Sequence, residues 1–413
     1  MKVLHLSTND IFGGAARAAF RLHHGLLESG VDSRMFVQTK YSGDSSVIGS
    51  TTQTGRLTAK LKYLVDSMPA IISRCSRGVT FSPAVFPDRV TKYAATIAPD
   101  IIHLHWIAGG FMRIETLSQL SRPIVWTLHD MWPFTGGCHY SGECSRYTGS
   151  CGCCPELRST IENDLSRRIW QRKAKAWRGA PITVIAPSSW MGGCAAASSL
   201  FSETDIKIIP NGIDTTLFQP SDRSIARKTL GLPLDRRLIL FGAMSPTGDP
   251  RKGFQHLLPA IKDLANNGWG ERAELLMYGE ISSEKIPDFG MKVRSMGQVS
   301  DDTLVCLNIA ADVMVAPSIQ DNLPNTVMES MSCGTPVVAF KIGGMPDMID
   351  HGESGWLACP FDHKDLAQGI VHVIDNVSRR EEMGRHAREK IVREYTDNIV
   401  ARRHIDLYEE LME

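Results

Sequence analysis

The segment that most constrains the fold runs from residue 312 to residue 340 and reads DVMVAPSIQDNLPNTVMESMSCGTPVVAF. A short apolar run at 313–316 is followed by proline, and a second β-branched run at 337–338 follows a Gly-Thr-Pro break. This pattern predicts a strand, a loop, a helix and a second strand. Asn325 or Thr326 is the expected N-cap of the helix.

The predicted loop and the start of its helix form a candidate anion site. A helix that begins at the carboxyl end of a buried strand presents free backbone N–H groups and its dipole to an anion, and open α/β sheets bind nucleotides in that crevice. Asp321 and Glu329 bracket the loop, and a carboxylate can accept both hydroxyls of a vicinal diol. The pair therefore suits a sugar nucleotide, whereas the alternative is a surface aspartate and a glutamate that only favours the helix dipole.

These residues resemble the acidic-pair segment of retaining GT-B glycosyltransferases of family 4. In that family two glutamates separated by seven residues precede a small-residue helix and the sequence Cys-Gly-Thr-Pro-Val-Val. Asp321 stands here at the position of the first glutamate. The resemblance implies the α/β GT-B fold, with two doubly wound Rossmann-like domains facing across a cleft, and a catalytic role for Asp321. It also implies donor-binding roles for Asn322, Leu323, Pro324, Asn325 and Glu329.

The length and charge of the chain fit this class. A chain of 413 residues suits two domains, and the 45 basic residues are balanced by 45 acidic ones, so no net field attracts nucleic acid. No run approaches 18 consecutive apolar residues, and the first residues read as a strand, not as a signal peptide. We therefore expect a cytoplasmic protein whose membrane contact, if any, is peripheral.

Strand and helix patterns alternate in both halves, which predicts two doubly wound sheets. Proline and Asn-Gly around 210–212 mark a linker. We expect an acceptor-side domain over 1–205 and a nucleotide-sugar donor domain over 206–395. The strongly helical tail resembles the terminal helix of the family, which crosses back, so residues from about 396 to 413 are expected to complete the first domain.

Three places in the first half are candidates for the site. Gly13 and Gly14 follow the first predicted strand, where glycine lets the backbone approach a ligand and leaves helix N–H groups free for phosphate; a plain tight turn is the alternative. They resemble the glycine loop of the family, which faces the donor diphosphate across the cleft. Arg17, one turn on, is a candidate contact for acceptor or phosphate, or is simply solvated.

Two further strands end in histidine, at His105 and at His129. Sites in α/β proteins lie at such strand ends, although a histidine there is often a satisfied core residue. The sequence Thr-Leu-His129-Asp-Met-Trp resembles bacterial exopolysaccharide transferases of the colanic-acid type, whose histidine contacts donor sugar and phosphate. That resemblance gives His129 a catalytic role, and His105 and Trp106 are acceptor-side candidates.

In the second half, Arg251-Lys252-Gly follows a predicted strand in a flexible loop. A lysine there suits a diphosphate, whose charge must be neutralised as the glycosidic bond breaks; an exposed basic turn is the alternative. In the family a similar Lys-Gly follows an arginine at the strand end. Lys252 takes the catalytic role of that lysine, and Arg251 is the candidate substitute for the arginine.

Cysteines crowd one loop, with Cys138, Cys144, Cys151 and Cys154 spaced Cys-x5-Cys-x6-Cys-x2-Cys. Four thiolates can hold a structural zinc ion. Free thiols or a labile disulfide are the alternatives. Catalysis itself is expected to need no cofactor, because no metal-binding Asp-x-Asp is placed for it.

Residues 55–78 form a basic amphipathic stretch. Such a helix can lie on an anionic membrane, as enzymes that act on lipid-linked sugars need. The alternative is a packed helix with a solvated basic face, broken by Pro69.

Together these features predict a retaining hexosyltransferase. The expected donor is a UDP-sugar, with a GDP-sugar next, and the expected acceptor is a hydroxyl of a saccharide or lipid-linked saccharide in exopolysaccharide synthesis. The rival from another class is a non-catalytic subunit that binds sugar nucleotide or polysaccharide. A dinucleotide oxidoreductase fits poorly, because no Gly-x-Gly-x-x-Gly follows a strand.

Overall fold

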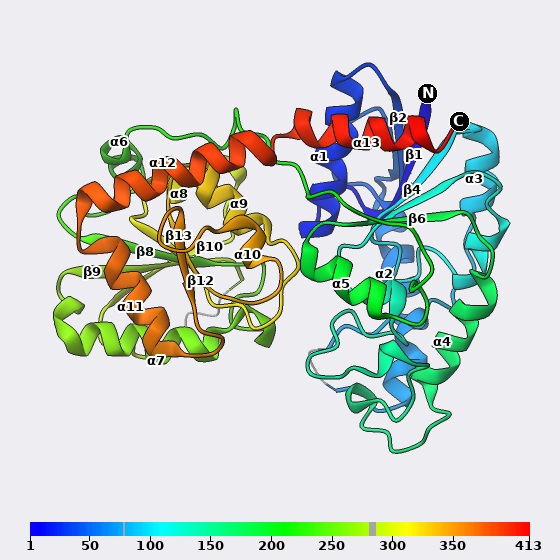
Figure 1. The fold of residues 1–413 in the computed structure, drawn as a ribbon, viewed down its shortest axis with the longest axis horizontal. Coiled ribbons are helices and arrows are strands. Elements are labelled where there is room, and N and C mark those ends of the chain that lie inside the picture. Colours follow the sequence, from blue (N-terminus) through cyan, green and yellow to red (C-terminus); the bar gives the residue numbers. More distant parts are fainter. Residues whose placement is uncertain (77–78, 281–285) are drawn as a thin grey trace. The chain divides into compact units, whose positions relative to one another are not determined.

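The chain folds into two compact α/β units (Figure 1). The structure is a computed structural model that describes residues 1–76, 79–280 and 286–413, so residues 77–78 of the basic stretch lie outside the description. Met1–Gly212 with Asp397–Glu413 forms one unit, and Ile213–Thr396 forms the other. Each unit is built on a parallel sheet. The predicted fold class, two Rossmann-like α/β domains, is confirmed.

The first unit has a seven-stranded sheet in the order β3-β2-β1-β4-β5-β6-β7. All neighbouring strands are parallel. The order reverses between β1 and β4, so the carboxyl ends of β1, β4 and β5 lie next to one another at one edge, where α/β sheets bind ligands. The strands are β1 Lys2–Asn9, β2 Asp32–Thr39, β3 Val47–Ser50, β4 Ile101–Leu104, β5 Ile124–Thr127, β6 Ile182–Ala186 and β7 Ile206–Ile208.

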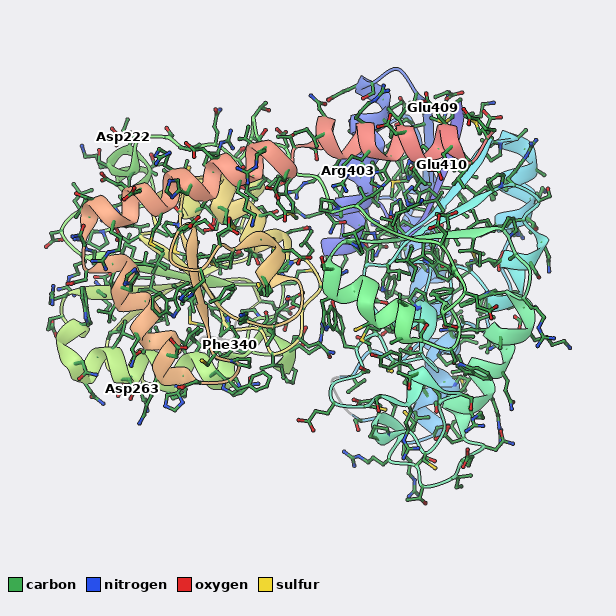
Figure 2. All side chains as sticks on the ribbon, in the orientation of Figure 1. Asp222, Asp263, Phe340, Arg403, Glu409 and Glu410 are labelled. Carbon is green, nitrogen blue, oxygen red and sulfur yellow. The ribbon has the colours of Figure 1, made fainter. Side chains whose placement is uncertain are left out.

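Helices cover this sheet, and the last of them comes from the end of the chain. A Cβ on Gly25 of α1 would lie 3.1 Å from the Cβ of Ala401 in α13, so the two helices are in close contact. Arg403 of α13 donates to the carbonyl of Ile208 in β7 at 2.7 Å (Figure 2). The helices are α1 Gly14–Glu28, α2 Gln53–Ile72, α3 Val90–Ile97, α4 Leu165–Ala176, α5 Ser189–Ala197 and α13 Asp397–Glu410.

The second unit has a six-stranded parallel sheet in the order β10-β9-β8-β11-β12-β13. Along β8, Leu238 and Leu240 pack into one apolar cluster while Ile239 and Phe241 pack into another, because successive side chains point to opposite faces. Both faces are therefore buried under helices. The strands are β8 Arg237–Gly242, β9 Ala273–Tyr278, β10 Lys292–Gly297, β11 Val313–Ala316, β12 Val337–Phe340 and β13 Gly355–Ala358.

The two apolar clusters separate the helices of this unit into two layers. One layer contains α6 Arg223–Thr229, α8 Asp301–Ala310, α9 Asn325–Ser332, α10 Met345–Met348 and α12 Val377–Glu394. The other contains α7 Phe254–Leu264 and α11 His363–Ile374. The buried Asp312 fixes the start of β11: it accepts from Arg227 at 2.7 Å and from the backbone N–H of Leu238 at 2.7 Å, and it also pairs with Arg380. This network holds the strand that leads to the predicted anion loop.

The structure corrects several boundaries. Residues 206–212, which the sequence placed in the second domain, lie in the first, because β7 pairs with β6. Pro69 does not break its helix, since α2 continues through it to Ile72. The N-cap of α9 is Pro324, not Asn325 or Thr326, and it makes no side-chain cap hydrogen bond.

No helix within the described ranges is both long enough and apolar enough to cross a bilayer.

Candidate functional site

In the second unit, Lys252 and Asp321 meet at the point where the strand order reverses. Lys252 lies in the loop after β8 and Asp321 in the loop after β11, and these strands are neighbours in the sheet. The Lys252 ammonium donates to the Asp321 carboxylate at 2.7 Å. A crossover between parallel strands thus joins two residues that are 69 positions apart in the sequence.

Two glycines let these loops approach each other. Gly253 has φ 73°, and a Cβ there would lie 1.7 Å from the carbonyl oxygen of Pro317. Gly343 has φ 52°, and a Cβ there would lie 1.9 Å from the carbonyl oxygen of Asp321. L-residues rarely adopt this conformation, and no side chain fits the space, so both positions require glycine. The backbone N–H of Ile319 donates to the carbonyl of Arg251 at 2.8 Å and ties the loops together.

Asp321 is held as a carboxylate. Its side chain is buried, and burial by itself opposes ionisation. The Lys252 charge and its hydrogen bond more than offset that effect, with help from Arg251 and from the Ser318 hydroxyl at 3.2 Å, so the pKa of Asp321 lies below its ordinary value. The carboxylate is therefore negative near neutral pH and able to accept hydroxyl groups.

The predicted donor-binding residues of the second unit lie in the same two loops and in α9. Arg251 lies beside Lys252 and donates to Asp249 at 2.6 Å, so part of its charge is already engaged. The segment 322–325 leads into α9, whose first turn starts at Asn325 with Pro324 before it. Leu323 and Glu329 are buried, the latter at 3% exposure. The structure thus gathers Arg251, Lys252, the acidic pair and the loop on one edge of one sheet.

In the first unit, the glycine loop is fixed by Asp10, a residue that our sequence reasoning missed. Gly13, at φ 101°, precedes α1, which starts at Gly14. The buried Asp10 carboxylate accepts from the backbone N–H groups of Ile11 at 2.9 Å and of Ser42 at 2.8 Å, which clamps the loop to the next strand connection. Arg17 is partly buried in the first turn of α1.

A chain of imidazoles connects the two predicted histidines to the interior. His129 Nε2 lies 3.1 Å from His105 Nδ1, and His105 Nε2 lies 2.9 Å from His5 Nδ1. His105 and His5 are fully buried, at 3% and 0% exposure. Sequence reasoning missed His5. It lies in the apolar strand β1, beside the strand that precedes His105, and a histidine in such a strand was the signal that could have identified it. The hydrogen-bond chain fixes the ring of His129 at the strand end.

Burial makes His129 a neutral residue. It lowers the pKa of His129 to about 4, although the nearby Asp130 acts in the opposite direction. A neutral imidazole donates from one nitrogen and accepts at the other, and it brings no positive charge. His129 can therefore orient a hydroxyl or a phosphate oxygen by hydrogen bonding, whereas charge compensation must come from other groups.

Trp106 belongs to a second buried network. Its indole N–H donates to the Asp130 carboxylate at 2.8 Å, and His139 Nδ1 lies 2.6 Å from the same oxygen. His139 Nε2 in turn lies 2.8 Å from the Ser82 hydroxyl. Burial opposes ionisation of Asp130, but His139 outweighs it and keeps the pKa of Asp130 below its ordinary value. The network makes Trp106 a rigid side chain directly after β4.

Comparison with known families decides the class of the protein. The profile described as "Glycosyltransferase Family 4" matches residues 12–217, and that described as "Glycosyl transferases group 1" matches residues 235–376. The chain belongs to glycosyltransferase family 4. One profile covers most of the first unit and the other covers most of the second. The residues after β4, β5, β8 and β11 that are described above therefore lie in the matched parts of this transferase.

Curated relatives and solved structures agree with this assignment. The D-inositol 3-phosphate glycosyltransferase of Acidothermus cellulolyticus is 27% identical over 318 residues, which are 73% of this chain and 65% of the relative. The same enzyme of Paenarthrobacter aurescens is 26% identical over 376 residues, 88% of this chain and 84% of the relative. The chain thus spans just under two thirds of the first of these relatives.

Solved structures superpose on nearly the whole chain, although few of the superposed residues are identical. Sucrose-phosphate synthase from Thermosynechococcus elongatus superposes with a TM-score of 0.71 at 19% identity, covering 99% of this chain and 98% of that one. Anabaena HepE in complex with UDP-glucose superposes with a TM-score of 0.66 at 18% identity, covering 99% and 100%. At these identities the likeness establishes that this glycosyltransferase has the GT-B fold.

Proposed function

We propose that this glycosyltransferase moves a hexose from a nucleoside diphosphate sugar to a hydroxyl acceptor with retention of configuration. The Lys252–Asp321 pair carries this proposal. In this proposal the Lys252 ammonium, which contacts Asp321 at 2.7 Å, neutralises the departing diphosphate, and the Asp321 carboxylate accepts sugar hydroxyls. The backbone N–H groups of the first turn of α9 supply further hydrogen bonds for an anion.

UDP is the proposed donor base, with GDP as the alternative. The HepE structures contain UDP, UDP with glucose, and UDP-glucose, and HepE shares the fold along its whole length. The related actinobacterial enzymes act on D-inositol 3-phosphate, as their names state. For this chain we propose a saccharide or lipid-linked saccharide of exopolysaccharide synthesis as the acceptor, on the strength of the segment around His129.

Calorimetry and thermal shift with UDP, GDP and ADP, each also as its glucose conjugate, test the donor. We expect UDP and UDP-glucose to stabilise the protein selectively, by about 2.7 kcal/mol at a hundredfold excess over Kd. Selective stabilisation by GDP would show that the donor is a GDP-sugar and not a UDP-sugar. If no nucleotide binds, the donor site is misplaced.

Turnover separates an enzyme from a binding subunit. With the stabilising donor and a set of saccharide acceptors, we expect release of the nucleoside diphosphate that depends on the acceptor. Proton NMR of the product checks retention, because the anomeric signal must match that of the donor. A protein that binds the donor tightly and never turns over with any acceptor would be the non-catalytic subunit.

The outward face of α2 supports a membrane-bound acceptor. Leu57, Leu61, Leu64, Met68 and Ile71 recur at helical spacing of four and three residues, and each is more than half exposed. The buried residues of α2, which are Ala59, Asp66 and Ala70, lie on the opposite side of the helix. The apolar stripe therefore points away from the core of the unit, whereas the helix packs through its opposite side.

We propose that this stripe rests on an anionic lipid surface, at the inner face of the cytoplasmic membrane. Arg56 and Lys60 flank the stripe on the exposed surface of α2, so the apolar face has cationic neighbours that match anionic headgroups. Such contact would bring the enzyme to a lipid-linked acceptor.

Vesicle sedimentation tests this surface. We expect the protein to bind vesicles of phosphatidylcholine with phosphatidylglycerol better than phosphatidylcholine alone, and Leu61→Asp with Leu64→Asp to lower binding at least tenfold, because each buried leucine contributes about 1.5–3 kcal/mol. Leu234→Asp, at an exposed leucine of the second unit, is the control. Equal vesicle binding by the wild-type protein and the double variant would contradict the proposal. So would a dimer of the wild-type protein that the two substitutions dissociate.

A further inference from the structure

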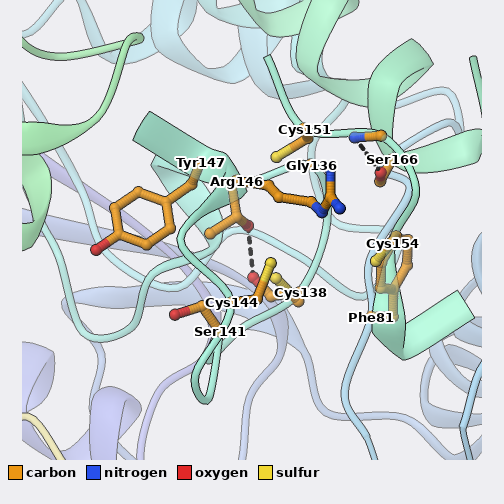
Figure 3. A pocket seen from close by; sticks show the side chains of 12 residues that line it. Phe81, Gly136, Cys138, Ser141, Cys144, Arg146, Tyr147, Cys151, Cys154 and Ser166 are labelled. Carbon is orange, nitrogen blue, oxygen red and sulfur yellow. Dashed lines mark hydrogen bonds between the residues drawn. The ribbon is translucent and has the colours of Figure 1, made fainter. Parts of the chain in front are cut away.

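Four cysteines line one small cavity in the first unit. Cys138, Cys144, Cys151 and Cys154 line a space of about 20 Å³, between β5 and α4, which is roughly the room of one water-sized particle. Figure 3 shows their side chains around this space, with Arg146 among them. The polar and charged groups discussed for sugar transfer do not line it. The cavity is thus a feature separate from the proposed donor site.

The backbone at the last two cysteines is held in an unusual conformation. Cys151, Gly152 and Cys153 have φ of 53°, 97° and 44°, so three successive residues are left-handed, and only one of them is glycine. A non-glycine residue in this region costs about 1 kcal/mol or more and persists when its surroundings enforce it. Hydrogen bonds from Gly152 N–H to Ser166 Oγ and from Cys154 N–H to the Asp164 carboxylate secure the turn.

A buried lysine lies beside the same cysteines. Lys173 of α4 is fully buried, donates to the carbonyl of Thr135 at 3.0 Å and lies 3.8 Å from the centre of the Trp132 ring. Among the described residues it makes no ion pair with a carboxylate. Besides Cys151 and Cys138, the buried Asp130 carboxylate is an anionic group whose charge acts on Lys173. A buried cation is unfavourable unless negative groups lie near it, so thiolates at Cys151 and Cys138 would stabilise Lys173.

We propose that Cys138, Cys144, Cys151 and Cys154 bind a structural zinc ion. Four thiolates around one Zn²⁺ carry a net charge of about −2, which Lys173 and Arg146 are placed to offset. Binding releases the thiol protons, and the Zn–S bonds form at about 2.3 Å without any change in redox state. The ion would fix the loop that follows His129 and holds Asp130 and His139.

Zinc binding requires the four side chains to turn inward. Within the described residues, the one group of three or more potential ligands whose ligand atoms all lie within 4.8 Å is His5, His103 and His105. Nitrogens of His5 and His105 already hydrogen-bond each other, and His103 bonds Thr127 and Tyr408. The thiols are farther apart, and rotation about the Cα–Cβ bonds into the cavity is the movement that brings them to the metal.

Elemental analysis of the full chain, produced without an affinity tag and purified without chelators, tests the proposal. We expect about one zinc per chain, and X-ray absorption with four sulfur neighbours at about 2.3 Å. Cys→Ser at any of the four positions should abolish stoichiometric zinc. Cys153→Ser should leave it unchanged, because Cys153 belongs to the same loop but does not line the cavity.

The wild-type measurements decide the matter if the serine variants do not fold. Absence of zinc together with rapid alkylation of all four thiols in the native protein would overturn the proposal. Iron with sulfide in place of zinc would overturn the identity of the metal. Loss of zinc in Cys153→Ser would overturn the set of four ligands. These readouts do not depend on sugar transfer, so the proposal stands or falls separately from the donor site.

Discussion

The first unit is expected to lose stability steeply as the pH falls below about 6.5. Burial lowers the pKa of His23 and His404 to about 4, and it lowers the pKa values of His5, His103 and His105 well below 6.5. Neighbouring histidines add to the effect at these three, and Asp44 partly opposes it at His23. These five side chains are buried, at 0–3% exposure, so a charge on any of them would be poorly solvated.

The sign follows from proton binding in the two states. Below pH 6.5 the unfolded chain binds a proton at each histidine, while the folded unit keeps these rings neutral until the pH approaches their lowered pKa values. Stability is therefore full above pH 6.5 and declines from there toward pH 4. Each histidine contributes a slope of up to about 1.4 kcal/mol per pH unit, so five together give several kcal/mol per pH unit. His129, whose pKa burial also lowers to about 4, adds a slope of the same sign.

Urea unfolding at pH 7.5, 6.5, 5.5 and 5.0 measures this slope. Tryptophan fluorescence reports mainly on the first unit, because Trp106, Trp126, Trp132, Trp170, Trp177 and Trp190 lie there and two tryptophans lie in the other. Hydrogen exchange followed by mass spectrometry adds a separate signal for each unit. His386→Gln, at a partly exposed histidine of α12, should leave the slope unchanged. A midpoint that stays constant between pH 7.5 and 5 would show that the buried histidines do not stay neutral.

Replacing Lys252 with methionine is expected to lower kcat/KM about 100- to 1000-fold. The reason is that the charge of the departing diphosphate develops in the transition state, where a fixed cation is most effective. Asp321→Asn should lower kcat/KM by a similar factor for a different reason, because its hydrogen bonds to the sugar would be weaker. Lys262→Met, at an exposed lysine of α7, should retain normal activity.

A paired substitution separates this role from a structural one. Lys252→Met leaves the buried Asp321 carboxylate without its cation, which we expect to cost about 1–3 kcal/mol of unfolding free energy. The double variant Lys252→Met with Asp321→Asn removes both charges, so stability should return while activity stays low. Steady-state kinetics and urea unfolding of the four proteins test this. A double variant that recovers activity along with stability would show that the pair only stabilises the fold.

The sequence by itself determined the local elements and the sheet edge on which the proposed donor site lies. The strand, loop and helix of 313–332 form where the apolar runs and the proline break predicted them, and the alternation of strands and helices gave two parallel sheets. These features depend on periodicity and turn chemistry within about 30 residues, which a single sequence displays directly.

Only the tertiary structure decided which distant residues meet. The contacts of Lys252 with Asp321 and of His5 with His105, and the burial of Lys173 beside the cysteine cavity, join residues far apart in the chain. Each depends on strand order and register, because a slip of one residue turns every side chain to the opposite face of the sheet. Many strand orders satisfy the same local pattern, and packing of the whole sheet against its helices selects one of them.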